Sequence, residues 1–526
     1  MINSIGLQNI RAFRGKIHSF PLAQLTAFTG SNSSGKSTIL KMLQLLRQTH
    51  GIKEPGAGDE PLLRLSGTQV DLGSYKSLVS DNNEEMEMGI AIGVTALIKK
   101  GYLQWLRSLQ IKDGNEFYWN EAEDNELKQY NLECYFRFST PPLPTSSGTL
   151  KLATFSLKYE EKDLLTWRVW RASPNNTSIY IISLPSFFTE ALDLSSKFLP
   201  ISDKTPNSDL FGAVDYITAM RGILPNAIIA TKPPNSESSK ISKTTAQPEG
   251  KPDYHKWPIP PIISDCFDDL DTALTEISYV GPLRPAGGRI YFAKGDAAQA
   301  LDPSGTDLPL TLSERREEQV VNFHLEGGGK VVEESLMSAL SYWLKYFRLG
   351  NIEGRPLEQS EIDLSKGDVI IEFKLQSPES ENKYYLADSG FGYSQIMPVL
   401  VSGLLTKKDG TLVVEQPELH LHPALQVRLA SFFLAMVQSG RQVLIETHSE
   451  HLVNALRVLI AEKGDIEFAA SCKIYYLDLK SNGLAIHDLS IGTDGMLTEW
   501  PNSFFGDALE LSARLLRAQQ KFIPKG

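Results

Sequence analysis

The feature that most constrains this chain is a glycine-rich turn near its start, which reads Gly-Ser-Asn-Ser-Ser-Gly-Lys-Ser from Gly30 to Ser37. A compact apolar run at residues 25–29 precedes the turn, and apolar residues follow at helical spacing over residues 36–48. In a strand–loop–helix unit, glycines let backbone N–H groups turn toward an anion, and the helix N-terminus adds its positive dipole end. The sequence therefore predicts a phosphate-binding loop (P-loop) in an α/β fold.

The P-loop also predicts which residues contact a nucleotide. Lys36 supplies a point charge for the β- and γ-phosphates of ATP, and the Ser37 hydroxyl is a ligand for Mg²⁺. ATP and Mg²⁺ are therefore the expected ligands. The residues assigned here to nucleotide binding are Gly30, Asn32, Ser33, Ser34, Gly35, Lys36, Ser37 and Thr38.

A P-loop needs a second acidic group, at the end of a neighbouring strand, to hold the magnesium shell. The apolar run at residues 412–414 ends at Glu415, which places a carboxylate where open α/β sheets bind their ligands. We expect Glu415 to join Ser37 at the metal. Gln416 and Glu418, which follow, are candidates for the hydrolysis step. His448, after a strand predicted at 443–446, is a further candidate because an imidazole there can hydrogen-bond a γ-phosphate.

A second glycine-containing turn lies upstream of Glu415. Ser389 and Gly390 precede another apolar helix, and this pattern predicts a second helix N-terminus that faces phosphate. Such turns are common, and it is the position just ahead of Glu415 that favours a site. Ser389 and Gly390 are therefore assigned to nucleotide binding as well.

Taken in order, these elements resemble the ATPase heads of the ABC class, and in particular the SMC-like and OLD-like bacterial ATPases. The likeness covers roughly residues 1–80 and 275–510. It is carried by Leu-Gln-Asn-Ile-Arg-Ala-Phe at 7–13, the P-loop, Gly-Phe-Gly-Tyr-Ser-Gln at 390–395, Glu-Gln-Pro-Glu-Leu-His-Leu-His-Pro at 415–423 and Glu-Thr-His-Ser-Glu at 446–450. Gly-Pro-Leu-Arg at 281–284 and the residues 499–505 are similar to the Septu-type subgroup, which is paired with nucleases in phage-defence operons.

The resemblance implies a P-loop head with a mixed sheet, helices on its faces and an antiparallel β subdomain. It also implies that two heads form a dimer around two ATP molecules, so that nucleotide binding acts as a conformational switch. One position departs from the family, because Gln416 stands where ABC heads carry a glutamate. Glutamine positions water but takes no proton. Either Glu418 substitutes for that glutamate, or hydrolysis is slow and ATP acts mainly as a clamp.

The predicted domain organisation is a head interrupted by an insertion. Residues 1–84 form the N-terminal part of the head, and residues 276–526 form its C-terminal part, where strands and helices alternate as in a parallel sheet. Residues 85–275 form a large α+β insertion that begins β-rich and includes a helix expected over 214–222. The stretch 231–261, rich in Pro, Ser, Thr and Lys, is the expected disordered loop.

Composition bears on the compartment and the partners. A net charge of −11 argues against a chain that coats nucleic acid nonspecifically, although a local basic groove stays open. The three cysteines are far apart, and we find no signal peptide and no apolar run long enough for a membrane helix. The expectation is a cytoplasmic protein without membrane contact.

Two functions remain after these observations. The first is an ATPase that dimerises around ATP and regulates a separate nuclease in antiviral defence, because the sequence carries no nuclease motif of its own. The alternative is an SMC-like DNA-repair or DNA-end-binding ATPase that contacts DNA directly. That alternative would use basic residues near the P-loop, namely Arg11, Arg14, Lys41, Arg47 and Lys53.

Overall fold

The computed structural model divides the chain into two compact units. The first comprises Met1–Pro21 and Lys41–Thr275, and the second comprises Leu22–Leu40 and Glu276–Gly526. Residues 1–84, expected to form one part of the head, contribute to both units. The structure describes residues 1–50, 62–99, 127–139, 149–159, 162–172, 178–183, 216–221, 224–231, 254–257, 261–294, 301–356, 368–376, 382–388, 391–481, 483–499, 501, 514–515 and 517.

The first unit is built on an eleven-stranded antiparallel sheet with the order β12-β11-β10-β9-β8-β7-β6-β5-β1-β2, and β4 pairs with β7. Its strands are β1 (Ile2–Gln8), β2 (His18–Pro21), β4 (Leu62–Arg64), β5 (Met88–Lys99), β6 (Leu127–Ser139), β7 (Thr149–Tyr159), β8 (Lys162–Ala172), β9 (Ser178–Ser183), β10 (Tyr216–Arg221), β11 (Leu224–Thr231) and β12 (Tyr254–Trp257). The unit also holds α2 (Tyr75–Leu78), η1 (Ser80–Asn82) and α6 (Pro261–Thr275). Helix α6 packs on β5, and its Phe267 ring lies 5.7 Å from the ring of Phe155.

Two expectations for the insertion meet the structure in this unit. The helix predicted over 214–222 is wrong, because Tyr216–Arg221 is strand β10 and pairs with β11. A short apolar run fits either periodicity, and here the pairing partner decides. Within the expected disordered stretch 231–261, Tyr254–Trp257 forms β12 and Pro261 begins α6. Residues 232–253 and 258–260 lie outside the described residues.

The second unit contains a six-stranded sheet of order β13-β20-β21-β3-β22-β23. Its strands are β3 (Leu25–Gly30), β13 (Ile277–Val280), β20 (Thr411–Glu415), β21 (Gln442–Glu446), β22 (Cys472–Lys480) and β23 (Gly483–Ser490). The first five run parallel, and β23 is antiparallel to β22. Strands β20 and β21 are buried along their whole length, as expected of central parallel strands that are covered on both faces.

Helices follow the parallel strands along the chain. The P-loop leads into α1 (Lys36–His50), and α9 (Phe391–Leu405), α10 (Pro423–Gln438), α11 (Glu450–Lys463) and α12 (Ile466–Ala470) continue the alternation. Helix α10 contacts β21 and β3, and α9 contacts β13 and β20. This is the predicted α/β class, with a mixed sheet and helices that pack on it. None of the described helices is long and apolar enough to cross a membrane.

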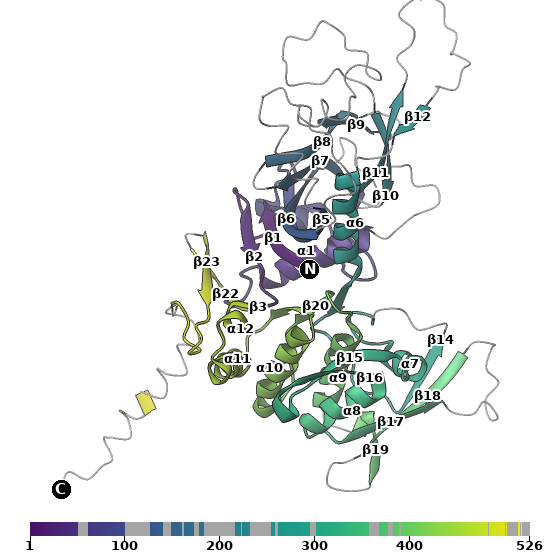
Figure 1. Cartoon of the computed structure of the whole chain (residues 1–526), viewed down its shortest axis with the longest axis vertical. Helices are drawn as coiled ribbons and strands as arrows, with labels where there is room; N and C mark the ends of the chain where they lie inside the picture. The colour runs from purple at the N-terminus through teal and green to yellow at the C-terminus, as the bar shows by residue number, and fades with distance from the viewer. Residues whose placement is uncertain are drawn as a thin grey trace, which may run out of the picture. The chain divides into compact units, whose positions relative to one another are not determined.

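The expected antiparallel part of the head is also present in the second unit. A four-stranded sheet has the order β14-β18-β17, with β19 beside β18. Its strands are β14 (Ile290–Lys294), β17 (Asn351–Pro356), β18 (Asp368–Gln376) and β19 (Lys383–Tyr385). The remaining elements are α7 (Leu308–Glu314), β15 (Gln319–His324), η2 (Glu326–Gly328), β16 (Lys330–Ser335), α8 (Leu336–Tyr346) and η4 (Leu386–Asp388). Strands β15 and β16 form a hairpin beside α8, α9 and α10 (Figure 1).

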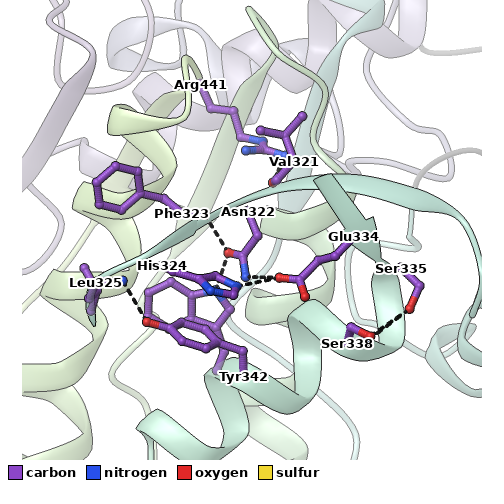
Figure 2. Close-up of polar contacts among 11 residues, drawn as sticks. Val321, Asn322, Phe323, His324, Leu325, Glu334, Ser335, Ser338, Tyr342 and Arg441 are labelled. Carbon is purple, nitrogen blue, oxygen red and sulfur yellow. Dashed lines mark hydrogen bonds and ion pairs between the residues drawn. The ribbon is translucent and has the colours of Figure 1, made fainter. Parts of the chain in front are cut away.

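The β15–β16 hairpin is joined to α8 by a polar network (Figure 2). The side chain of Asn322 is fully buried; its Oδ1 accepts from the Trp343 indole at 2.8 Å, and its Nδ2 donates to Glu334 at 2.9 Å. Glu334 also bonds His324 at 2.7 Å, and the His324 ring stacks on Tyr342 with centroids 4.1 Å apart. These contacts fix the hairpin against the core although it has only two strands.

Candidate nucleotide-binding site

The P-loop is held against the neighbouring strand β22 in a conformation that requires glycine. Gly30 has a φ of 136°, and a Cβ placed on it would lie 1.9 Å from the carbonyl oxygen of Leu477. The Ser31 N–H donates to that same oxygen at 3.0 Å. Gly35 also has a positive φ, of 101°. The loop thus curls away from β3 before α1 begins at Lys36, as the sequence pattern predicts.

Lys36 lies inside the P-loop. Its ammonium donates to the carbonyl of Ser31 at 2.6 Å and to that of Gly30 at 3.2 Å, and the residue is only 3% exposed. Burial lowers the pKa of Lys36, and the nearby charge of Glu446 partly offsets this. Of the other predicted nucleotide contacts, Ser34 and Thr38 are buried, Gly35 and Ser37 are half-buried, and Asn32 and Ser33 are exposed.

The carboxylate that meets Ser37 comes from a strand to which the sequence assigned no ligand. The Ser37 hydroxyl donates to Glu446 at 2.8 Å. Glu446, at the end of β21, pairs with Glu415 on one side and with Phe28 of β3 on the other. Both carboxylates therefore emerge at the same level of the sheet edge, and both residues are 2% exposed. The available signal was that apolar residues 443–445 end in a glutamate just as 412–414 do.

Glu415 itself is held from the far side. The Tyr279 hydroxyl, on β13, donates to Glu415 Oε1 at 2.7 Å. Next in the chain, Gln416 adopts a left-handed φ of 45°, and its N–H donates to the carbonyl of Glu446 at 2.8 Å. Arg284 donates to the carbonyl of Glu415 at 2.8 Å. The turn that carries Gln416 is thus fixed by bonds from both sides.

Glu418 contacts the segment after β21, at Thr447 and His448. One carboxylate oxygen accepts the His448 N–H at 2.7 Å, and the other accepts the Thr447 hydroxyl at 2.9 Å. Burial raises the pKa of Glu418, and these hydrogen bonds and the nearby Arg284 work against that rise. Although His448 is exposed, its partial desolvation and the charge of Lys36 both lower its pKa. The structure therefore brings His448 near Lys36, and the Glu418 carboxylate binds the backbone N–H of His448.

The predicted second phosphate contact cannot be placed, because Ser389 and Gly390 lie outside the described residues. On one flank, Asp388 pairs with Arg289 at 2.7 Å. On the other flank α9 begins at Phe391, and Gly392 approaches Leu421 in the segment after Glu418. The assignment of Ser389 and Gly390 to nucleotide binding stays a prediction.

The chemistry of the edge suits magnesium. Ser37, Glu446 and Glu415 offer hydroxyl and carboxylate oxygens, which are hard ligands, and Mg²⁺ takes few of these because it keeps waters and phosphate oxygens. Among the described residues no group of three or more His, Cys, Asp or Glu side chains is arranged to hold a metal ion. The oxygens here therefore fit a nucleotide-borne Mg²⁺ better than a cage made by protein alone.

Comparison with known proteins agrees with this class of site. The family described as AAA ATPase domain matches residues 332–453, which run from β16 through Glu415 and Glu446 into α11. The match covers less than half of the chain. The match agrees with the P-loop and the sheet order, which an ATPase domain would also show, but the P-loop itself lies outside the matched residues. No curated protein matches the chain.

The solved structures that the chain resembles include three heads of SMC proteins. An SMC head bound to the C-terminal winged-helix domain of ScpA is 12% identical, covers 93% of this chain and 98% of its own, and gives a TM-score of 0.38. The SMC head domain from Thermotoga maritima is 8% identical, with coverages of 93% and 99% and a TM-score of 0.34. A head with an extended coiled coil, bound to a ScpA domain derived from Pyrococcus furiosus, is 10% identical, with coverages of 99% and 99% and a TM-score of 0.35. At such TM-scores the fold is better judged from strand order.

Proposed function

We propose that this chain is an SMC-like, ABC-type ATPase that binds Mg²⁺-ATP and hydrolyses it slowly. The observation that carries this proposal is the convergence of Lys36, the Ser37–Glu446 pair and Glu415 at one edge of the parallel sheet. A bound Mg²⁺ would polarise the phosphate oxygens and offset the charge of the carboxylates. Lys36 would bind the β- and γ-phosphates, and Ser37 would orient the metal together with Glu415 or Glu446.

Slow hydrolysis is supported by the side chains that face the turn. Gln416 stands where a water-activating base is expected, and an amide orients water without taking its proton. Glu418 is the other candidate base, but both of its oxygens already accept hydrogen bonds, from Thr447 and His448. Glu418 is better suited to hold His448 toward the γ-phosphate than to activate water. Nucleotide binding then acts chiefly as a switch.

The partners follow from the motifs rather than from the geometry. We propose that two copies dimerise around ATP, with Ser389 and Gly390 of each contacting the nucleotide of the other. We further propose that the dimer regulates a separate nuclease in antiviral defence, which the likeness of residues 281–284 and 499–505 to Septu-type ATPases supports. Because the sequence carries no nuclease motif, we propose that a partner protein carries out the cleavage of nucleic acid.

The test is phosphate release by the purified chain with Mg²⁺-ATP, beside Lys36→Ala. We expect turnover below the typical enzyme value of roughly 10 per second and its loss in Lys36→Ala, because the variant lacks the charge that binds the β- and γ-phosphates. Light scattering with ATP and with ADP checks the dimer. Wild-type protein that neither binds nor hydrolyses ATP would refute the proposal.

The alternative, direct action on DNA, makes a different prediction in the same assay. It requires that DNA stimulate turnover and that the stimulation fall steeply as salt is raised. Two of the basic residues that motivated it are already engaged: Arg14 pairs with Asp81 at 2.7 Å, and Arg47 donates to Gln69 at 3.1 Å. We therefore expect turnover to be insensitive to DNA.

A further inference from the structure

One sequence motif has no role in the function proposed above, namely the Gly281–Arg284 turn that follows β13. Strand β13 lies beside β20 in parallel register, with Val280 opposite Val414. Its C-terminal end therefore reaches the same sheet edge as Glu415. Two side chains of this segment, Tyr279 on the strand and Arg284 after the turn, both contact the end of β20.

Tyr279 contacts the carboxylate. Its hydroxyl donates to Glu415 Oε1 at 2.7 Å, and the residue is 4% exposed. An ionised carboxylate oxygen can only accept, so the Tyr279 hydroxyl is the donor in this bond. A hydrogen bond of this kind sets the rotation of the carboxylate about its last torsion.

Arg284 contacts the backbone of the same turn. Its guanidinium donates to the carbonyl of Glu415 at 2.8 Å, to that of Gln416 at 3.5 Å and to that of Gln395 on α9 at 3.3 Å. The Gln395 side chain donates back to the Arg284 carbonyl at 3.1 Å. A guanidinium stays charged at neutral pH, and Arg284 is 7% exposed, so its charge is buried beside the turn that carries Glu415 and Gln416.

These contacts explain how Gln416 holds its unusual backbone. A residue other than glycine at a φ of 45° is strained by its Cβ, and such strain persists only where neighbours over-determine it. Arg284 binds the carbonyls of Glu415 and Gln416, which lie in the two peptide units on either side of the Gln416 Cα, while the Glu446 carbonyl accepts the Gln416 N–H. The planar guanidinium spreads its donors over several nitrogens in a fixed fork, whereas the donors of a lysine ammonium all sit on one nitrogen.

We propose that Tyr279 and Arg284 are positioning residues that preset the Glu415 carboxylate and the Gln416 turn for the metal-bound nucleotide. The proposal rests on the ATPase function above and assigns a task to the Gly-Pro-Leu-Arg motif. Tyr279 acts through Glu415 on the magnesium shell, and Arg284 acts through the backbone on the residue that orients water. Outer contacts of this kind fix metal ligands and tune their affinity.

The first test compares Tyr279→Phe with Tyr346→Phe. Each variant loses one hydroxyl and keeps the ring; Tyr346 donates to Ser431 at 2.8 Å, between α8 and α10. We measure ATP affinity in EDTA, the Mg²⁺ concentration for half-maximal ATP retention, and kcat and KM per nucleotide-binding site. In Tyr279→Phe we expect affinity in EDTA to be unchanged and the Mg²⁺ requirement to rise on the order of tenfold, while Tyr346→Phe matches wild type.

The second test is Arg284→Lys, which keeps the charge and removes the fork. We expect kcat to fall on the order of tenfold with KM nearly unchanged, because the turn that carries Gln416 is no longer held while the P-loop is intact. A merely structural role would instead lower the thermal midpoint and the fraction of binding-competent protein, with kcat per competent site unchanged.

The outcomes separate this proposal from the function on which it rests. If wild type binds no nucleotide, the ATPase function is refuted and the positioning role falls with it. If wild type retains Mg²⁺-ATP but Tyr279→Phe keeps a wild-type Mg²⁺ requirement, the role of Tyr279 is refuted and the ATPase function stands. If kcat per competent site is equal in Arg284→Lys and wild type, the role of Arg284 is refuted and the ATPase function stands.

Discussion

Two buried arginines of the second unit, Arg284 and Arg441, lie at opposite ends of the parallel sheet. Arg284 binds the carbonyl of Glu415, the last residue of β20, whereas Arg441 immediately precedes β21, which runs parallel to β20. They are 7% and 1% exposed, and burial lowers the pKa of each to about 10. Residue type, burial and titration therefore do not tell the two apart.

Their surroundings do. Glu415, Glu418 and Tyr279 act electrostatically on Arg284, whereas desolvation alone shifts the pKa of Arg441. The guanidinium of Arg441 donates to neutral oxygens, those of Val321, Leu404, Thr406 and Ser439 (Figure 2 shows the first). We infer that Arg441 joins the β15–β16 hairpin to the ends of α9 and α10, and that the carboxylates mark the functional end of the sheet.

The largest expected effect comes from completing the functional end. Gln416→Glu introduces a carboxylate at the water-orienting position, and the two side chains have nearly the same shape, so the turn is preserved. Turnover should rise toward the ~10²-fold that a positioned general base contributes. Phosphate release under saturating Mg²⁺-ATP measures the change. Turnover equal to wild type would show that Glu418 already takes the proton of the attacking water and acts as the general base.

The next effect tests the two arginines against each other. Arg284→Met should lower kcat per folded molecule on the order of tenfold, because the carbonyls that it binds belong to the turn at Gln416. Arg441→Met should leave that value unchanged but destabilise the fold by on the order of 4 kcal/mol or more, because four acceptors lose their donor at on the order of 1–3 kcal/mol each. Turnover and urea midpoints, measured together, decide the matter.

Arg441→Lys serves as a milder variant if Arg441→Met does not fold, since it keeps the charge and some of the donors. The contrast fails if either Arg441 variant loses kcat in proportion to Arg284→Met. It fails equally if Arg284→Met proves to be only a stability variant, with a lowered midpoint and a normal kcat.

The sequence predicted the strand and helix elements at this end of the sheet correctly because their signals are local. The P-loop, the strand that ends at Glu415 and the helix after it are each specified within about ten residues by apolar spacing and by glycine. Local apolar spacing alone also predicts a helix over residues 333–348. Its start is wrong, because Ser335 caps α8 and Glu333 pairs with Val321 across the hairpin.

The contacts that the sequence missed are all between segments distant in the chain. Glu446 meets Ser37 because β21 lies beside β3, an adjacency that local spacing does not state. Tyr279 reaches Glu415 only because β13 forms the edge of the same sheet. Arg441 gave no sequence signal, because three of its partners are backbone carbonyls, of Thr406, Val321 and Leu404. Sequence patterns identify the residues that carry the chemistry but not the residues that hold them.

The smallest expected effect comes from a substitution in the β15–β16 hairpin, which Arg441 contacts at the end of the sheet away from Glu415. His324→Phe keeps an aromatic ring to stack on Tyr342 and removes the contact with Glu334, which still accepts from Asn322. The side chains of His324 and Glu334 are 31% and 18% exposed, so the lost pair should cost less than about 1 kcal/mol.

Turnover of His324→Phe should equal that of wild type, and a urea midpoint beside phosphate release checks both values. A fall in kcat without a fall in stability would contradict the division drawn here. It would mean that a change in the hairpin alters Glu446 and His448 through Val321, Arg441 and β21, so that the two ends of the sheet are energetically coupled.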